Sequence, residues 1–194
     1  MGTTAENKVE FGLRNAYYAP ITESEDGNIS YGTPVRIPGA VSLTIDPSGD
    51  LIRFKADDVD YYTNPNNQGY EGNLNLARVT DKFREDILGE TLTKGGVLVE
   101  NADAQTKRFA LLFEFQGDKK AIRHVLYYCS ANRPTEASQT KDGGDPNTTD
   151  LSIVASPRPD NSIVKAKTTP GVTDAIYNAW YTKVYESASE AAGA

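Results

Sequence analysis

The only histidine and the only cysteine of the chain, His124 and Cys129, stand five residues apart and raise the question of a catalytic pair. A thiol nucleophile needs a base within hydrogen-bond reach, roughly 2.6 to 3.2 Å. The segment that holds both, residues 121–133, is rich in β-branched and aromatic side chains, and with residues 108–116 it predicts a β-hairpin around the turn GDKK. Residues five apart on a strand lie about 16 Å from each other and point to opposite faces. We therefore expect Cys129 to be a small buried hydrophobe and His124 a strand or interface residue, with no catalytic pair.

Carboxylates are the other side chains that could bind a metal ion or take part in catalysis, and they cluster in residues 23–28 and 56–60. A calcium or magnesium site needs several oxygens that converge on one point, and neither cluster has EF-hand spacing. Residues 23–28 are better interpreted as a hairpin turn. The chain contains no phosphate-binding glycine loop, no hydrolase nucleophile elbow and no histidine-based metal motif. We expect no cofactor, no metal site and no enzymatic activity, although the sequence leaves a pair of carboxylates for glycoside hydrolysis open.

Length and composition predict one folded domain over residues 1–194, with a core in residues 8–186. The 20 Lys and Arg side chains against 27 Asp and Glu give a net charge of −7, which argues against tight binding to a phosphate backbone. A single cysteine can form no internal disulfide, so we expect folding in a cytoplasm. The first ten residues have neither an apolar run nor a basic head, and predict no signal peptide and no membrane anchor.

The elements around these residues follow mostly from alternation of apolar and polar side chains. We predict about ten strands in a mainly β fold, an antiparallel β-sandwich or barrel. Besides the hairpin, alternation marks residues 41–46, 51–56, 72–79, 95–101, 151–156 and 161–168, and we expect each of these strands to have one dry face. A short middle helix is expected over 80–89, with Thr80 as its N-cap, and a C-terminal helix over 168–187. Its start is either Thr169/Pro170 or Thr173, and Ile176, Trp180 and Val184 should form the stripe that docks on a sheet.

Three segments do not fit the strand pattern. Residues 135–149 form a long polar loop, the kind that is usually functional or ordered only on binding. Residues 187–194 are expected to be a flexible tail. Residues 61–79 place tyrosines and amides where charges would be usual, and this composition suits either a protein contact or an ordinary solvated strand face.

Several stretches together resemble the major tail protein, the tail tube subunit, of long non-contractile-tailed phages of Gram-positive bacteria. They are residues 15–23, 32–50, 56–74, 83–90, 110–134 and 155–168. The resemblance implies a structural virion protein of the phage tail tube fold that closes into hexameric rings. These rings would stack into the tube through which DNA is ejected. It also implies assembly in the host cytoplasm, a place in the virion tail, and a tape-measure protein, a tail-tip protein and a tail-terminator protein as partners.

The resemblance suggests roles for two sets of residues. Six copies carry 6 × −7 = −42 charges per ring, and an acidic lumen would let DNA slide in transit without sticking. Asp58, Asp60 and Glu71 are the candidate lumen-facing acidic residues. In this family an arm or long loop commonly reaches the next ring, and residues 135–149 are the candidate here. The residues at the centre of that ring-stacking loop are Lys141, Asp142, Gly143, Gly144 and Asp145.

Two alternative functions stay open at this point. The first is the tube protein of a secretion particle or a tailocin-like particle, which would share the fold. The second is a monomeric carbohydrate-binding β-sandwich, since such folds host many functions. Self-assembly would favour a tube protein, and binding to glycans without self-assembly would favour the second alternative.

Overall fold

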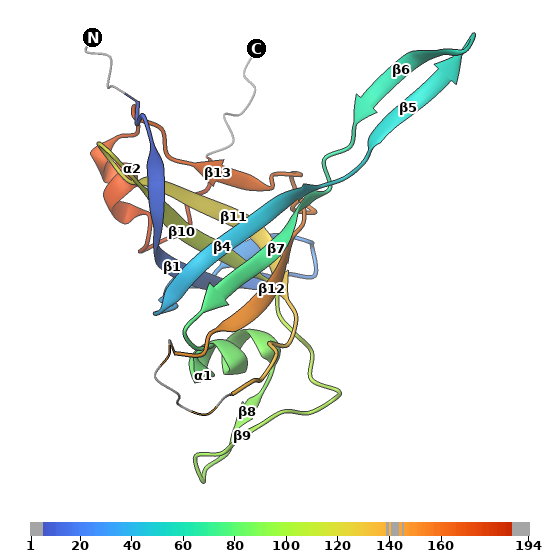
Figure 1. The fold of residues 1–194 in the computed structure, drawn as a ribbon. Helices are drawn as coiled ribbons and strands as arrows, with labels where there is room; N and C mark the ends of the chain where they lie inside the picture. Colours follow the sequence, from blue (N-terminus) through green and yellow to red (C-terminus); the bar gives the residue numbers. More distant parts are fainter. Residues whose placement is uncertain (1–5, 139, 141–143, 145, 188–194) are drawn as a thin grey trace.

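A computed structural model describes residues 6–138, 140, 144 and 146–187 of the chain. In this part the chain forms thirteen strands and two helical segments (Figure 1). The strands are β1 (Glu10–Glu23), β2 (Ile29–Tyr31), β3 (Val35–Arg36), β4 (Ala40–Ser48), β5 (Leu51–Ala56), β6 (Val59–Pro65), β7 (Gly69–Leu76), β8 (Thr91–Leu92), β9 (Leu98–Val99), β10 (Phe109–Gly117), β11 (Ile122–Ala131), β12 (Thr149–Ala155) and β13 (Lys165–Lys167). The helical segments are α1 (Asp81–Phe83), continued by the π-helical turn η1 (Arg84–Leu88), and α2 (Asp174–Ala179).

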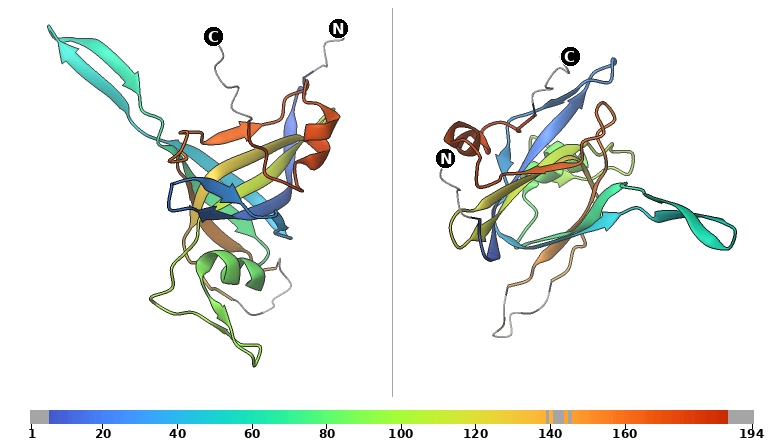
Figure 2. Two further views of the ribbon diagram at one scale, coloured as in Figure 1. Left: turned by 180° about the vertical axis from the view of Figure 1, so that it is seen from behind. Right: turned by 90° about the horizontal axis from the view of Figure 1, so that it is seen from above.

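Nine strands form one antiparallel sheet, in the order β2-β1-β10-β11-β12-β7-β4, with β13 beside β11 and β3 beside β1. The sheet curls until its last strand, β4, comes back beside β1, as the view from above shows (Figure 2). The result is an incompletely closed barrel. This arrangement confirms the predicted mainly β, antiparallel fold, in its barrel form. None of the described helices is long and apolar enough to cross a membrane.

The main core fills the inside of the curled sheet. Central strand β10 is buried on both faces: Phe109, Leu111 and Phe113 point into the main core, while Ala110 and Leu112 point to a second, smaller core outside the sheet. This strand has nearly continuous apolar character for that reason. The two cores together predict that β10 is the most protected strand of the molecule.

The middle helix closes one end of the main core. Thr80 is its N-cap, and its hydroxyl accepts a hydrogen bond from the Phe83 amide at 3.2 Å. Phe83 and Ile87 are fully buried in the main core, and the helix ends at Gly89, whose φ of 78° is in the left-handed region. The predicted cap, buried face and stop are all confirmed, although the second half is π-helical.

The C-terminal helix packs on the outer face of β10 and β11. It begins after Thr173, the second of the two predicted starts, and it ends at Ala179, so the predicted length of 168–187 is wrong. The reason is local: the Thr182 hydroxyl donates a hydrogen bond to the Ala179 carbonyl at 2.8 Å, and the chain leaves the helix in turns. Trp180 and Val184 still bury themselves against the sheet as predicted.

Candidate functional site

His124 and Cys129 lie on the same face of β11, contrary to the expected opposite faces. His124 pairs with Phe113 and Cys129 with Phe109, and both partners point into the main core. A β-bulge causes the difference, because between Leu126 and Cys129 the strand β11 uses one residue more than its partner strand. The paired positions on β10 are four residues apart, about 13 Å at ~3.3 Å per residue. The two side chains are therefore too far apart to form a catalytic pair. The sequence predicted this outcome, but it predicted opposite faces of the strand, whereas distance along one face is what separates them.

The surroundings of Cys129 and His124 also make both side chains unreactive. Cys129 is fully buried, and burial raises the pKa of its thiol to about 12. The His124 ring stacks on Phe113 with ring centroids 5.0 Å apart. Burial, with help from Lys167 and Lys165, lowers the pKa of His124 to about 4. A buried thiol that stays protonated is not a nucleophile, and an imidazole with a pKa of about 4 is a weak base.

The most conspicuous feature of the fold is a two-stranded arm formed by β5 and β6. It projects away from the barrel as a continuation of the β4–β7 pair (Figures 1 and 2). Glycines with positive φ stand where the arm leaves the sheet: a Cβ on Gly49 would lie 1.8 Å from the Asn66 carbonyl oxygen, and a Cβ on Gly69 1.9 Å from the Ala155 carbonyl oxygen. The Gln68 amide donates to the Ser48 carbonyl at 2.9 Å across the same place. The backbone segments at the base of the arm are therefore closely packed and hydrogen-bonded to each other.

The arm is amphipathic, but both of its faces are in water. Cross-strand pairs share a face, so the pairs Ile52–Asn64, Phe54–Tyr62 and Ala56–Val59 define one mainly apolar side. The other side carries the apolar pair Leu51–Pro65 at the base of the arm, followed by the polar pairs Arg53–Thr63 and Lys55–Asp60. On the apolar side the exposed fractions are 51% for Ile52, 59% for Phe54, 59% for Val59 and 57% for Tyr62. The prediction that residues 51–56 have one dry face is wrong for the single chain, because no part of the described barrel covers the arm.

A second exposed surface is the outer face of the β4–β7–β12 part of the sheet. Aligned positions across the three strands form rows of small polar and acidic residues. The rows are Ser42–Asn75–Asp150, Thr44–Asn73–Ser152 and Asp46–Glu71–Val154. The Asn75 amide donates to Asp150 at 2.7 Å, and the Ser152 hydroxyl donates to the Asn73 side-chain oxygen at 2.8 Å. These rows contain three carboxylates and no Lys or Arg.

The three predicted acidic site residues do not lie together. Asp58 is in the turn at the tip of the arm, and Asp60 follows on β6, where it pairs with Arg53 at 3.7 Å. Glu71 lies on β7, within the polar and acidic face. Spacing in the sequence did not reveal this, because the arm carries residues 51–65 away from the sheet to which residue 71 belongs.

The centre of the predicted ring-stacking loop lies largely outside the described residues. Lys141, Asp142, Gly143 and Asp145 are outside the described residues, and Gly144 is an exposed bend. At the start of the loop, Glu136 pairs with Arg84 of the middle helix at 2.8 Å. The role of residues 135–149 therefore stays a prediction.

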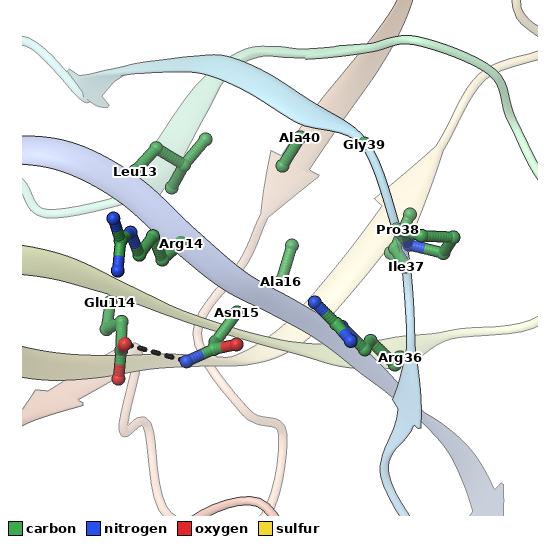
Figure 3. A pocket seen from close by; sticks show the side chains of 10 residues that line it. All are labelled: Leu13, Arg14, Asn15, Ala16, Arg36, Ile37, Pro38, Gly39, Ala40 and Glu114. Atoms are coloured by element: carbon green, nitrogen blue, oxygen red, sulfur yellow. Dashed lines mark hydrogen bonds between the residues drawn. The ribbon is translucent and has the colours of Figure 1, made fainter.

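Two hollows lie on the barrel surface at a distance from the polar face. The first, about 440 Å³, lies where β1 and β4 approach each other; Arg14 and Arg36 line it, and Asn15 donates to the buried Glu114 carboxylate at 2.7 Å (Figure 3). The second, about 260 Å³, is lined by Asn7, residues 119–122 and residues 168–170. Within the described ranges, no three His, Cys, Asp or Glu side chains converge as a metal site would require.

Comparison with known proteins places these surfaces in context. The sequence profile of a family described as phage tail tube protein matches residues 3–192. No curated protein matches the chain significantly. A solved sheath/tube terminator of an extracellular contractile injection system, PVC, aligns with a TM-score of 0.49 at 12% identity, over 80% of this chain and 94% of that chain. The tube-terminating cap of the anti-feeding prophage aligns with a TM-score of 0.49 at 9% identity, over 86% of this chain and 97% of that chain.

Proposed function

The chain belongs to the phage tail tube protein family, and we propose that it forms hexameric rings that stack into the tail tube through which DNA is ejected. It is a structural protein of the virion tail, and its role requires no catalysis. The observation that carries the proposal is the amphipathic arm, because an isolated two-stranded hairpin is at best marginally stable in water. A partner subunit would bury the solvent-exposed apolar side of the arm and so stabilise it.

The barrel also supports self-assembly through its edges. Strand β4 ends the sheet, and Val41 on this strand is 55% exposed. An unpaired edge strand is a template for pairing with another chain, and a closed ring removes such edges. An arm on one side and a free edge on another favour heterologous contacts, which close into rings or continue as filaments.

The polar and acidic face of β4, β7 and β12 is the surface that we assign to the lumen. Asp46, Glu71 and Asp150 make it negative without any basic side chain in the rows, and a negative wall repels phosphates. DNA would then pass without being held. Of the three acidic residues predicted from the sequence, only Glu71 belongs to this surface, and Asp58 and Asp60 belong to the arm.

The remaining partners follow from the same proposal. In a tail tube, the chain would contact a tape-measure protein inside the tube, a tail-tip protein at one end and a tail-terminator protein at the other. Assembly would take place in the host cytoplasm. The loop over residues 135–149 remains a candidate for a contact between rings.

Electron microscopy of the concentrated full-length protein tests the proposal. Mild salting-out strengthens apolar burial and should drive association into rings or hollow tubes. A parallel sample should contain an extract with tail tips, in case growth needs an initiator. Particles of single-subunit size under all these conditions would contradict the tube function, and glycan binding by such particles would favour the carbohydrate-binding alternative.

The lumen assignment has its own test in tails that have already assembled. Reversing the charges of Asp46, Glu71 and Asp150 to Lys should slow DNA ejection and leave tube length unchanged. The control variant reverses Asp58 and Asp60, which lie on the arm, and it should affect assembly instead. If the first variant ejected DNA at the normal rate, the lumen assignment would be wrong.

A further inference from the structure

The tip of the arm combines two aspartates with an apolar pair. Asp57 and Asp58 form the turn, with φ values of 51° and 61°, and both are exposed. Two successive positive φ values are characteristic of the type I′ turn, which holds a tight hairpin. Among the described residues neither aspartate takes part in an ion pair. Directly behind the turn, Ala56 and Val59 pair across the arm.

The hollow of about 260 Å³ beside the β10–β11 turn has the opposite character. Ala121, Ile122 and Pro170 supply apolar walls, and Lys119 and Lys120 stand among the lining residues. Lys119 is exposed and has no ion pair in the described part of the chain. Lys120 lies 4.0 Å from the exposed Asp174 carboxylate, and its ammonium group stands 4.0 Å above the centre of the Tyr177 ring.

This hollow is built in advance rather than formed by flexible side chains. The Asn7 side chain accepts hydrogen bonds from the Lys119 and Lys120 amides, both at 3.1 Å, and donates to the Lys120 carbonyl at 2.7 Å. A Cβ on Gly117 would lie 1.9 Å from the Asn7 side-chain nitrogen, so the close packing of this turn requires glycine. A preorganised site loses less conformational entropy when it binds.

We propose that the arm tip of one copy docks into this lysine-bearing hollow on a second copy. Asp57 and Asp58 would lie against Lys119 and Lys120, and Val59 would enter between the apolar walls. The inference rests on the proposed tube function and names the surface that receives the arm. Charge and apolar character both match at the same place.

The surface next to the hollow can take the rest of the arm. Tyr177 on α2 donates a hydrogen bond to the Ala121 carbonyl at 3.1 Å, so α2 borders the hollow directly. Along α2 lies another hollow, of about 320 Å³, lined by Ala175, Ile176 and Ala179 among others. The apolar side of the arm, with Phe54, would lie over it.

The two other hollows fit the tip less well. The arginine-bearing hollow of Figure 3 has a mainly polar exposed wall, which offers little apolar surface to Val59. Its buried Glu114 carboxylate is already paired with Arg123 at 3.2 Å, so Arg14 and Arg36 set its charge. The hollow beside α1 contains Arg78 and Arg84, but both are already paired with carboxylates, and acidic residues outnumber them there. The hollow beside α1 therefore lacks free positive charge, and the arginine-bearing hollow lacks the mainly apolar wall that Val59 requires.

The position of the hollow agrees with a repeating contact. The β10–β11 turn and α2 lie on the side of the barrel away from the arm in every view (Figures 1 and 2). One copy can therefore donate its arm to a neighbour and receive the arm of another. Such a head-to-tail contact repeats without blocking itself.

Cysteine pairs that leave all charges in place test the contact. The double variant Ala56→Cys/Ala121→Cys places one thiol behind the arm tip and one in the hollow, and Cys129 is too buried to interfere. A disulfide needs Cα atoms about 4.4 to 6.8 Å apart. After mild oxidation under the salting-out conditions, the double variant should give a ladder of oligomers on a denaturing gel, whereas each single variant can give dimers at most.

In the matched control the second cysteine stands at position 40 and not at position 121. Ala40 lines the arginine-bearing hollow. The variant Ala56→Cys/Ala40→Cys should give no ladder. A ladder from this control, or none from the first pair, overturns the inference. Tubes without the ladder would leave the proposed function intact, while a ladder without rings or tubes would support the contact and refute the tube.

Charge exchange gives an independent readout. Asp57→Lys/Asp58→Lys and Lys119→Asp/Lys120→Asp should each lower the yield of sedimentable polymer by about tenfold, because like charges would meet at the contact. The combination of all four changes should restore polymer. If the combination failed while Arg14→Asp/Arg36→Asp rescued the arm variant, the arm would dock at the other hollow and the inference would be wrong.

Discussion

Removal of one aromatic ring from the apolar side of the arm should weaken assembly and leave the fold unchanged. Phe54 is 59% exposed in the single chain, and full burial of a phenylalanine contributes about 1.5 to 3 kcal/mol. Covering the exposed part at a subunit contact is therefore worth about 1 to 2 kcal/mol. Phe54→Ser should lower the association constant by roughly 5- to 30-fold for each contact.

The critical concentration for polymer formation measures this effect directly. It should rise by the same factor of about 5 to 30, as determined by sedimentation of polymer at a series of protein concentrations. Lys55→Ser is the matched control, since Lys55 is the next residue and lies on the polar side of the arm. The melting temperature of the unassembled protein should not change in either variant, because surface substitutions cost within about 0.5 kcal/mol. An unchanged critical concentration for Phe54→Ser, or an equal rise for Lys55→Ser, would refute the reasoning.

Three further predictions concern the barrel. The unfolded chain takes up a proton at His124 near pH 6.5, whereas burial lowers the pKa of His124 in the folded protein to about 4. The contribution of neutral His124 to the free energy of unfolding is therefore complete above pH 6.5 and is lost as the pH falls toward 4. This loss, about 2 to 3 kcal/mol after allowance for partial exposure, should be absent in His124→Phe when urea unfolding of the two proteins is compared. Cys129 should resist maleimide labelling at pH 8 and react once the protein is unfolded, because its thiol is fully buried and its pKa is about 12; fast labelling of the native protein would contradict the buried position. Phe83→Ala should destabilise the fold by about 3 to 5 kcal/mol, since the ring is buried in the main core, and a loss below 1 kcal/mol in calorimetry would show that the middle helix does not close the core.

The predictions from sequence were most accurate where a local pattern has one structural meaning. The cap Thr80, the buried Phe83 and the stop Gly89 each depend on neighbouring residues alone, and all three occur as predicted. The hairpin over residues 108–133 is also correct, because its turn and both strands are contiguous. Resemblance to phage tail tube proteins identified the family, and the family match over residues 3–192 confirms it.

The failures occurred where the same pattern has two meanings. Alternation in residues 51–56 predicts a strand with an apolar face, but it does not say what covers that face; here no part of the described chain does. Faces of β11 were assigned wrongly because a single extra residue at a bulge reverses the alternation for everything beyond it. The lumen-facing role of Asp58, Asp60 and Glu71 stays a prediction, and the structure places Asp58 and Asp60 on the arm and Glu71 on β7.

The sequence by itself determined the mainly β class of the fold, several of its strands and the Thr80 cap, because these depend on periodicity, on turn chemistry and on residues close together in the chain. Its resemblance to phage tail tube proteins gave the family. The long first strand β1 was not among the predicted strands. Tertiary structure alone decided that residues 51–65 leave the sheet as an arm, that Glu71 shares its face with Asp46 and Asp150, and that a hollow bordered by Lys119 and Lys120 lies on the other side of the barrel. The physical reason is that surfaces are made of residues from distant strands, so their charge and shape exist only after the sheet has curled.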